Sequence, residues 1–322
     1  MNLYPLKFKP ILKERLWGGT KLKDLFGKLS TSEITGESWE LSTVKGDISI
    51  VSNGELASTS LQELIDKYPN EMLGKSVVER FGTEFPILIK FIDAKQDLSI
   101  QLHPNDALAK ERHNSFGKTE MWYIIDADPG AELIVGFNKD VSKKEYEASL
   151  ETDTLLDLLN YEKVREGDTF FINTGKIHAI GAGVLLAEIQ QTSDVTYRIF
   201  DFNRKDNEGN LRELHTEMAL DAIDYEKKDD FKVVYSKEMN LVNPMVDCPY
   251  FKTNYLDLDK DLVLDTKNRD CFTIYMCVHG GAIIENESGK VSLQKGETTL
   301  VPANSEKITI RTKGTKLLEV TI

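Results

Sequence analysis

Residues 166–173 read EGDTFFIN, and residues 295–302 read KGETTLVP. In each segment, a glycine is followed by an acidic residue and a threonine. Three further residues come next, the last two of them apolar, and the segment ends with Asn or Pro. A stretch of this kind is typical of a turn that leads into a short strand. Its recurrence predicts that one β unit occurs twice in the chain.

Short segments rich in β-branched and aromatic residues recur on both sides of these two stretches, and Gly, Asp and Asn separate them. Clear examples are residues 85–92, 121–125, 132–137, 184–190 and 272–278. Short strands with frequent turn signals favour an all-β sandwich or barrel. We therefore expect a mainly β protein made of two jelly-roll β-barrels, with small helical insertions in the N-terminal half.

Helical periodicity is confined to a few patches. Apolar residues at positions 61, 64, 65 and 68 predict one helix, and a weaker pattern covers residues 218–225. A helical insertion between Phe137 and Tyr161 accounts for the greater length of the first β unit. The charged segment near residues 226–240 is the expected boundary. We expect a first domain of residues 1–235, which carries the insertions, and a second domain of residues 236–322.

The composition excludes several classes of protein. The chain has 322 residues, of which 40% are apolar and 29% are charged, and its formal net charge is −13. Such a chain is neither disordered nor collagen-like, and its charge disfavours binding to nucleic acid or to an anionic membrane. The three cysteines form no CxxC motif, and the N-terminus lacks a signal-peptide core. We expect a cytoplasmic protein that binds neither nucleic acid nor membranes; the sequence indicates no oligomeric state.

The stretch SIQLHP at residues 99–104 carries the clearest chemistry. On a strand, Gln101 and His103 point to the same face, because side chains alternate. Glu120 follows 17 residues later, and His178 follows a turn after a strand. Amide, imidazole and carboxylate groups make a site for a divalent metal, for which zinc is the preferred ion and manganese, iron or cobalt are alternatives.

Basic residues occur close to these candidate ligands. Lys90 interrupts the apolar run PILIKF, where it is either a buried lysine with a partner or a lysine at the end of a strand. Lys118 precedes Glu120 by two residues, and Arg198 follows Glu188 by ten. In an acidic chain, this concentration of cations predicts a small anionic ligand.

Arg198 has a second interpretation, as half of a surface ion pair with Asp194 or Asp201. The three remaining histidines, His113, His215 and His279, lie outside the pattern, and we interpret them as structural or surface residues.

Six motifs together resemble the type I mannose-6-phosphate isomerases, in their short bacterial form, within the cupin superfamily. The resemblance covers the N-terminal two thirds, and the C-terminal third resembles a degenerate cupin-like barrel. The motifs are RLWGG at 15–19, GESWELS at 36–42, and those within residues 90–106, 118–120, 175–183 and 190–204.

The resemblance implies two cupin-like barrels, with one zinc ion per chain in the N-terminal barrel. It implies zinc ligands at four positions: Gln101, His103, Glu120 and His178. It also implies a reaction, the interconversion of mannose 6-phosphate and fructose 6-phosphate through a cis-enediol.

The resemblance also assigns the charged residues. Arg198 matches the family's active-site arginine, and Lys90, Lys118 and Glu188 match charged groups around the substrate. We expect Arg198, Glu188 and Lys118 to be catalytic, and Lys90, Lys118 and Arg198 to bind a small phosphorylated sugar. Three alternatives stay open: a cupin dioxygenase, a non-catalytic sugar-binding bicupin, and a cupin isomerase acting on glucose 6-phosphate.

Overall fold

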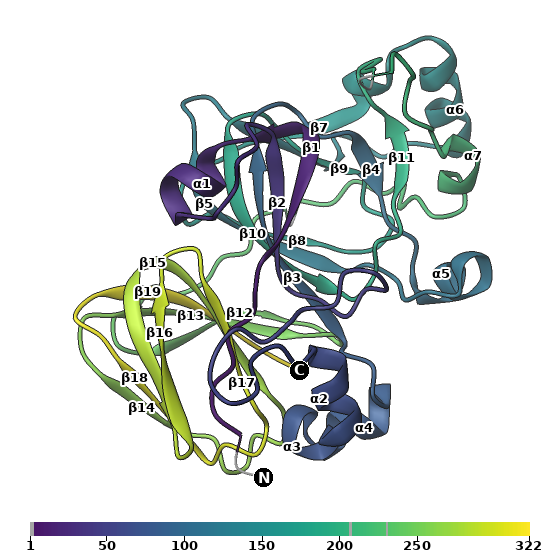
Figure 1. Cartoon of the computed structure of the whole chain (residues 1–322). Helices are drawn as coiled ribbons and strands as arrows, with labels where there is room; N and C mark the ends of the chain where they lie inside the picture. The colour runs from purple at the N-terminus through teal and green to yellow at the C-terminus, as the bar shows by residue number, and fades with distance from the viewer. Residues whose placement is uncertain (1–2, 206–207, 230) are drawn as a thin grey trace.

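The computed structural model describes residues 3–205, 208–229 and 231–322. Residues 1, 2, 206, 207 and 230 of the predicted first domain lie outside the described residues. Strands dominate the described chain, which confirms the mainly β fold, and they form three antiparallel sheets (Figure 1).

The first sheet, which we call the central sheet, has six strands in the order β1-β2-β3-β10-β5-β8. Its strands are β1 (Ile11–Gly19), β2 (Thr35–Leu41), β3 (Ile87–Ala94), β10 (Val184–Gln191), β5 (Glu120–Ala127) and β8 (Thr169–Ile172). Strands β2, β3 and β10 are buried along their whole length. Both faces of these strands must therefore be covered by other parts of the chain.

A five-stranded sheet, in the order β11-β4-β9-β6-β7, covers one face of the central sheet. Its strands are β11 (Tyr197–Phe200), β4 (Ile100–Leu102), β9 (His178–Ile180), β6 (Glu132–Phe137) and β7 (Leu159–Lys163). Ile92 and Leu186 of the central sheet share one apolar cluster with Leu133 and Ile180 of the five-stranded sheet. This packing leaves the two sheets facing one another.

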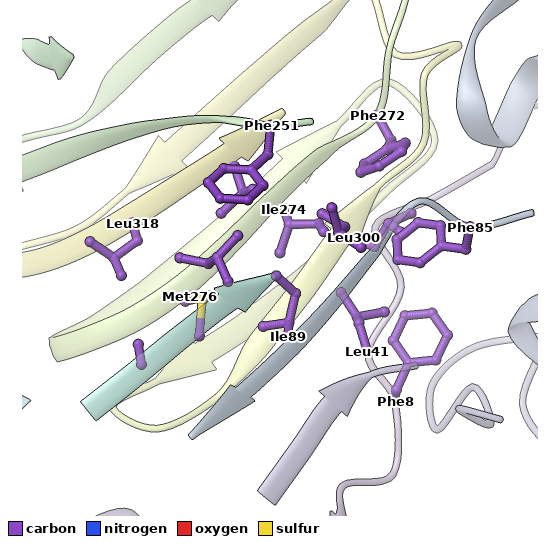
Figure 2. Packing of buried hydrophobic residues seen from close by; sticks show 14 of the residues in the cluster. Phe8, Leu41, Phe85, Ile89, Phe251, Phe272, Ile274, Met276, Leu300 and Leu318 are labelled. Carbon is purple, nitrogen blue, oxygen red and sulfur yellow. The ribbon is translucent and has the colours of Figure 1, made fainter. Parts of the chain in front are cut away.

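The C-terminal sheet covers the opposite face. Its main path is β12-β13-β19-β15-β18-β14, and β16 and β17 also pair with β15. Its strands are β12 (Val242–Asp247), β13 (Lys252–Leu258), β14 (Leu262–Asp265), β15 (Thr273–Asn286), β16 (Gly289–Gln294), β17 (Thr298–Val301), β18 (Lys307–Arg311) and β19 (Thr315–Thr321). Figure 2 shows Leu41 and Ile89 of the central sheet against Ile274, Met276 and Leu318 of the C-terminal sheet.

The beginning of the chain also joins the C-terminal sheet. Leu6 and Leu300 exchange two backbone hydrogen bonds of 2.8 and 2.9 Å, and Asn286 donates a hydrogen bond to the carbonyl of Leu3. Figure 1 marks the C-terminal end in the half of the molecule that holds this sheet. The domain boundary at residue 235 stays a prediction. Residues 3–8 belong to the predicted first domain but pack against the sheet of the predicted second domain.

The two copies of the sequence repeat occupy corresponding places. Residues 169–172 form β8 beside β5, and residues 298–301 form β17 beside β15. Gly167 and Gly296, which precede these strands, have φ values of +82° and +81°, where a side chain would be strained. We retain the two-barrel arrangement as a proposal, which this correspondence supports.

The correspondence extends across neighbouring strands. In the central sheet, Glu188, Trp122 and Phe170 lie side by side on β10, β5 and β8. In the C-terminal sheet, Glu319, Tyr275 and Thr299 lie side by side on β19, β15 and β17. Trp122 donates a hydrogen bond to Glu188, and Tyr275 donates one to Glu319. Each β unit therefore buries a carboxylate held by an aromatic side chain on the next strand.

The helices are short and lie between strands. They are α1 (Lys21–Phe26), α2 (Leu61–Lys67), α3 (Pro69–Leu73), α4 (Lys75–Phe81), α5 (Asp106–His113), α6 (Lys143–Glu151) and α7 (Thr216–Ala219), with a 3₁₀-helix at Leu155–Leu158. Ser60 and Glu63 form a capping box that starts α2. The insertion expected after Phe137 is confirmed as α6 and the 3₁₀-helix.

The helix predicted over residues 218–225 is wrong, because α7 ends at Ala219 and the chain continues in turns. Met218, Ala222 and Tyr225 still pack against one apolar cluster, so their spacing reflects burial and not helix. Within the described ranges, no helix is long and apolar enough to cross a lipid bilayer.

The shared core predicts that the sheets unfold together. Phe272 is fully buried, and its ring centroid lies 5.0 Å from that of Phe85, which precedes β3. Phe272→Ala should lower the free energy of unfolding by about 3–5 kcal/mol in urea titrations, because a cavity opens between the sheets. Leu29→Ala, at a side chain that is 98% exposed, should change it by under about 0.5 kcal/mol. Two separate unfolding transitions would contradict a shared core.

Candidate active site

A cleft of about 440 Å³ opens between the central sheet and the five-stranded sheet. Both sheets contribute polar side chains to it, in contrast to the apolar packing elsewhere between them. The central sheet supplies Lys90 and Glu188, and the five-stranded sheet supplies Gln101, His178 and Arg198. The cleft therefore brings together candidate residues that are up to 108 positions apart in the sequence.

Three of the four predicted metal ligands meet beside this cleft. One donor atom each of His103, Glu120 and His178 lies within 4.8 Å of the other two. The Nε2 atom of His103 lies 3.5 Å from one carboxylate oxygen of Glu120, and that of His178 lies 3.6 Å from the other. All three residues are buried, so the cluster is shielded from bulk water.

The backbone fixes both imidazole rings in the orientation that a metal ligand needs. Nδ1 of His103 lies 2.9 Å from the carbonyl oxygen of Val195, and Nδ1 of His178 lies 2.8 Å from that of Lys176. A neutral ring in these contacts carries its proton on Nδ1 and leaves the Nε2 lone pair free.

Both rings are neutral at pH 7. Burial lowers the pKa of His178 to about 4, and Lys118 acts in the same direction. Burial also lowers the pKa of His103, with further contributions from Lys118 and His178. Since metals bind the neutral imidazole, the electrostatics favour a metal over a proton at these two rings.

The cluster leaves buried polar atoms without partners. In the described part of the chain, Nε2 of His103 and both carboxylate oxygens of Glu120 have no hydrogen-bond partner. Burial raises the pKa of Glu120 to about 8, although the Lys118 ammonium opposes this. Unpartnered buried donors and acceptors are costly, and a divalent cation would satisfy all three atoms. The donor set therefore fits a metal ion.

Gln101 lies beside this cluster. Its backbone on β4 is in register with His178 on one side and Arg198 on the other. Its amide nitrogen is 3.5 Å from Nε2 of His178, and its amide oxygen accepts a hydrogen bond from Ser99. A half-turn of the amide exchanges these two atoms and brings the oxygen to the cluster. Its role as the fourth ligand stays a prediction.

Lys90 and Glu188 form a buried ion pair on neighbouring strands. Lys90 lies in the middle of β3, not at its end, and its ammonium nitrogen is 3.0 Å from Oε2 of Glu188. Trp122 donates a hydrogen bond of 3.1 Å to the other oxygen. The Lys90 ammonium also lies 5.1 Å from the centre of the Trp39 ring, in a cation–π contact.

These contacts keep both groups of the pair charged. Burial acts to raise the pKa of Glu188, but Lys90 and Lys118 outweigh it and hold that pKa below its usual value. Burial acts to lower the pKa of Lys90, but Glu188 and Glu37 outweigh it and raise that pKa. The cleft therefore presents an ionised carboxylate at neutral pH.

The remaining predicted cations, Lys118 and Arg198, also line the cleft. The Lys118 ammonium lies 3.5 Å from Glu120. Tyr197 is buried in the apolar cluster behind β11, so strand alternation turns Arg198 toward the cleft. Arg198 forms no ion pair among the described residues, and the pairs with Asp194 or Asp201 that the sequence left open are not formed.

Other residues of the cleft were not predicted as site residues. Arg15 and Trp39 both donate hydrogen bonds to Glu37, and these residues lie within the RLWGG and GESWELS motifs. All three tryptophans of the chain, Trp17, Trp39 and Trp122, line the cleft. The conspicuous tryptophans in both motifs are the signal in the sequence that points to these positions.

The three histidines outside the pattern do not join the cluster. His113 contacts the hydroxyl of Tyr197 at 2.9 Å, and His279 is exposed. His215 accepts a hydrogen bond from the backbone N–H of Arg198 and donates its own backbone N–H to the Arg198 carbonyl. His215 therefore supports β11 from the side opposite β4.

Two family models match the chain. The model for the catalytic domain of type I phosphomannose isomerase matches residues 5–157, and the model for the cupin domain of mannose-6-phosphate isomerase matches residues 242–319. The chain is 38% identical to the mannose-6-phosphate isomerase ManA of Bacillus subtilis over 306 residues, which are 94% of each chain.

Further relatives extend this similarity. A mannose-6-phosphate isomerase of Streptococcus mutans is 40% identical over 219 residues, 68% of this chain and 67% of the relative. The crystal structure of the Bacillus subtilis mannose 6-phosphate isomerase superposes with a TM-score of 0.89 at 33% identity, over 99% of this chain and all of the other.

The cluster predicts one tightly bound metal ion per chain. His178→Ala should lose most of the bound metal, because it removes one of two imidazole donors. Metal analysis of purified protein, dialysed after loading with zinc, measures this. His279→Ala, at an exposed histidine, is the matched control and should retain the parent's content. Two tightly bound ions per chain, or an unchanged content in His178→Ala, would contradict the assignment.

Proposed function

Because the chain belongs to the type I mannose-6-phosphate isomerases, we propose that it interconverts mannose 6-phosphate and fructose 6-phosphate with a zinc ion as cofactor. The observation that carries this proposal is the buried His103–Glu120–His178 cluster beside the cleft that Glu188 lines. Gln101 completes the proposed ligand set. Family membership favours this isomerase over the dioxygenase, the sugar-binding bicupin and the glucose 6-phosphate isomerase.

The reaction moves one proton between C1 and C2 of the sugar. In the direction of fructose 6-phosphate, C2 loses a proton and the carbonyl oxygen at C1 gains negative charge. The proton of the C2 hydroxyl then moves to the C1 oxygen, and C1 takes up the proton that left C2, which leaves a ketone at C2. The shared intermediate is a cis-enediol. When bound, the zinc ion acts as a Lewis acid on the sugar oxygens. The side chains of the cleft must supply the base and further stabilise the charge.

Glu188 is the proposed base. Its carboxylate is ionised at neutral pH, and Trp122 holds one oxygen in place, so that the other oxygen takes the proton from C2 and returns it to C1. Lys90 lies directly beside that second oxygen and keeps it charged before the transfer. The pair therefore combines a fixed position with a suitable protonation state.

Arg198 and Lys118 are the proposed electrostatic groups. Both line the cleft; Lys118 lies 3.5 Å from Glu120, and Arg198 forms no ion pair among the described residues. Arg198 donates to Ser99 and to the backbone carbonyl of Glu213, which orients its planar guanidinium. Fixed cations of this kind stabilise negative charge that develops on the sugar oxygens in the transition state. Lys90, Lys118 and Arg198 also suit a phosphorylated sugar as substrate.

A coupled assay for fructose 6-phosphate tests the proposal. Mannose 6-phosphate should be converted by the zinc-loaded chain, and a chelator should abolish this activity, because the cluster then loses its cation. Adding zinc back should restore it. Full activity in metal-free protein, or turnover that requires oxygen, would overturn the proposed function.

Arg198→Ala should lower turnover by roughly 10²–10³, since a positioned donor is lost from a water-poor site. Its metal content should be unchanged. Arg198→Lys should recover little, because a point charge does not reproduce the planar set of donors. Arg165→Ala, at a side chain that is 90% exposed, is the control and should keep the parent's turnover. Turnover within a few-fold of the parent in a metal-loaded Arg198→Ala protein would remove Arg198 from the mechanism.

A further inference from the structure

Asp201 anchors two arginines just beyond the end of β11. Arg212 approaches it side-on: Nε donates to one carboxylate oxygen at 2.7 Å, and Nη2 donates to the other. Nη2 of Arg204 also donates to Asp201, at 2.7 Å. Asp201 is only 5% exposed, so this carboxylate is committed to holding guanidinium groups.

The two arginines face different surroundings. Arg212 lines the cleft together with Arg198, whereas Arg204 does not and instead donates to the backbone carbonyl of Asp97. With Nε and Nη2 bound to Asp201, Nη1 of Arg212 makes no hydrogen bond within residues 3–205, 208–229 and 231–322. Asp201 therefore fixes the Arg212 guanidinium in the cleft wall while leaving donors unused.

Arg212 lies at the end of the cleft away from the metal cluster. His178, Gln101 and Arg198 occupy one row across β9, β4 and β11, so Arg198 is two strands, roughly 10 Å, from His178. His215 bonds to the backbone of Arg198 on the side of β11 opposite β4, and the Arg198 guanidinium donates to the backbone carbonyl of Glu213. Arg212 continues this wall beyond Arg198.

Positive charge accumulates at this end. Two guanidinium groups, on Arg204 and Arg212, contact the single buried carboxylate of Asp201, and a third, on Arg198, lies near it without an ion pair. Burial lowers the pKa of Arg198, and the neighbouring charges of Arg212 and Arg204 lower it further, although Asp201 opposes them. The exposed carboxylate of Glu213 lies near Arg198, and that of Asp194 lines the cleft. Among the described residues, neither forms an ion pair with Arg198. A bound anion would balance this cluster.

Arg15, the remaining arginine of the cleft, contributes no excess positive charge. Arg15 donates to the carboxylate of Glu37 at 2.7 Å and to the backbone carbonyl of Glu14 at 3.2 Å. Its charge is therefore matched by one carboxylate, which also accepts from Trp39. The two walls of the cleft differ, and only the wall beyond Arg198 combines unused donors with excess positive charge.

We propose that Arg212, held in place by Asp201, binds the phosphate group of the substrate and sets the preference for phosphorylated sugars. In a hexose 6-phosphate, the phosphate is at the opposite end of the carbon chain from C1 and C2. An anchor beyond Arg198 thus leaves the reacting carbons beside the metal cluster and Glu188. Asp201 is a positioning residue. This inference rests on the proposed function for the identity of the sugar phosphate.

Steady-state kinetics on the zinc-loaded chain test the inference. Arg212→Gln should raise KM for mannose 6-phosphate by about 10- to 100-fold, the effect of losing charge-assisted hydrogen bonds, while kcat stays within about threefold. Inhibition by inorganic phosphate should weaken by a similar factor. Arg212→Lys should recover part of the loss, because it keeps the charge. Asp201→Asn should raise KM less than Arg212→Gln does, since the cation remains but is no longer fixed.

Arg112→Gln is the matched control. Arg112 pairs with Asp221 outside the cleft, and its side chain is 25% exposed against 24% for Arg212. It should change neither KM nor inhibition by phosphate. An unchanged KM in a folded Arg212→Gln protein would overturn the inference. A fall in kcat with unchanged KM, or a KM effect confined to Arg15→Gln, would overturn it as well.

Failure of the proposed function is distinguishable. If the parent does not form fructose 6-phosphate, that function fails, but calorimetric titration with inorganic phosphate still compares the parent with Arg212→Gln. Weaker phosphate binding in the variant would then support the anion site, and equal binding would refute it.

Discussion

Burial of the central sheet on both faces is the constraint on which the rest of the structure depends. Apolar side chains meet the C-terminal sheet on one face, where Ile89 and Ile274 share a core. On the other face the same strands carry charged groups, and a charge can be buried there only if another group compensates it. Lys90 and Glu188 compensate each other across adjacent strands. The need to compensate buried charge in this sheet therefore also fixes the position of Glu188, the proposed base.

The metal cluster and the ion pair are linked by their electrostatics. Lys118 lowers the pKa values of His103, His178 and Glu188, and it also opposes the rise in the pKa of Glu120. One ammonium group thus adds to the effect of burial in keeping the imidazoles neutral, and it favours the ionised form of both carboxylates. Removing a cation from such a site would change the protonation of several groups together, so that effects of single substitutions here are not additive.

Sequence reasoning found the metal cluster and the charged groups because each lies on a strand or turn with a short, readable spacing. Gln101 lies on β4, His103 directly follows that strand, and the Gly-Asp turn before His178 is a local signal. The sequence did not predict the Arg15–Glu37 contact or the Asp201–Arg212 contact. Each depends on how a loop or strand folds back on a neighbour, which no periodicity encodes. The prediction of a helix over residues 218–225 was wrong for a related reason. The spacing of apolar residues indicates which side chains are buried, whether or not the backbone is helical.

The matching rows Glu188–Trp122 and Glu319–Tyr275 place the same arrangement, a buried carboxylate held by an aromatic donor, in two different surroundings. In the C-terminal sheet, Arg269 and Asn254 donate hydrogen bonds of 2.9 and 2.8 Å to Glu319, so that both of its oxygens are occupied. In the central sheet, the corresponding carboxylate of Glu188 lines the cleft. Such a pair of rows is what duplication of an ancestral β unit would leave behind. In the C-terminal sheet, neighbouring side chains donate to both oxygens of the buried acid, so this carboxylate can brace its strands but has no oxygen left to take a proton.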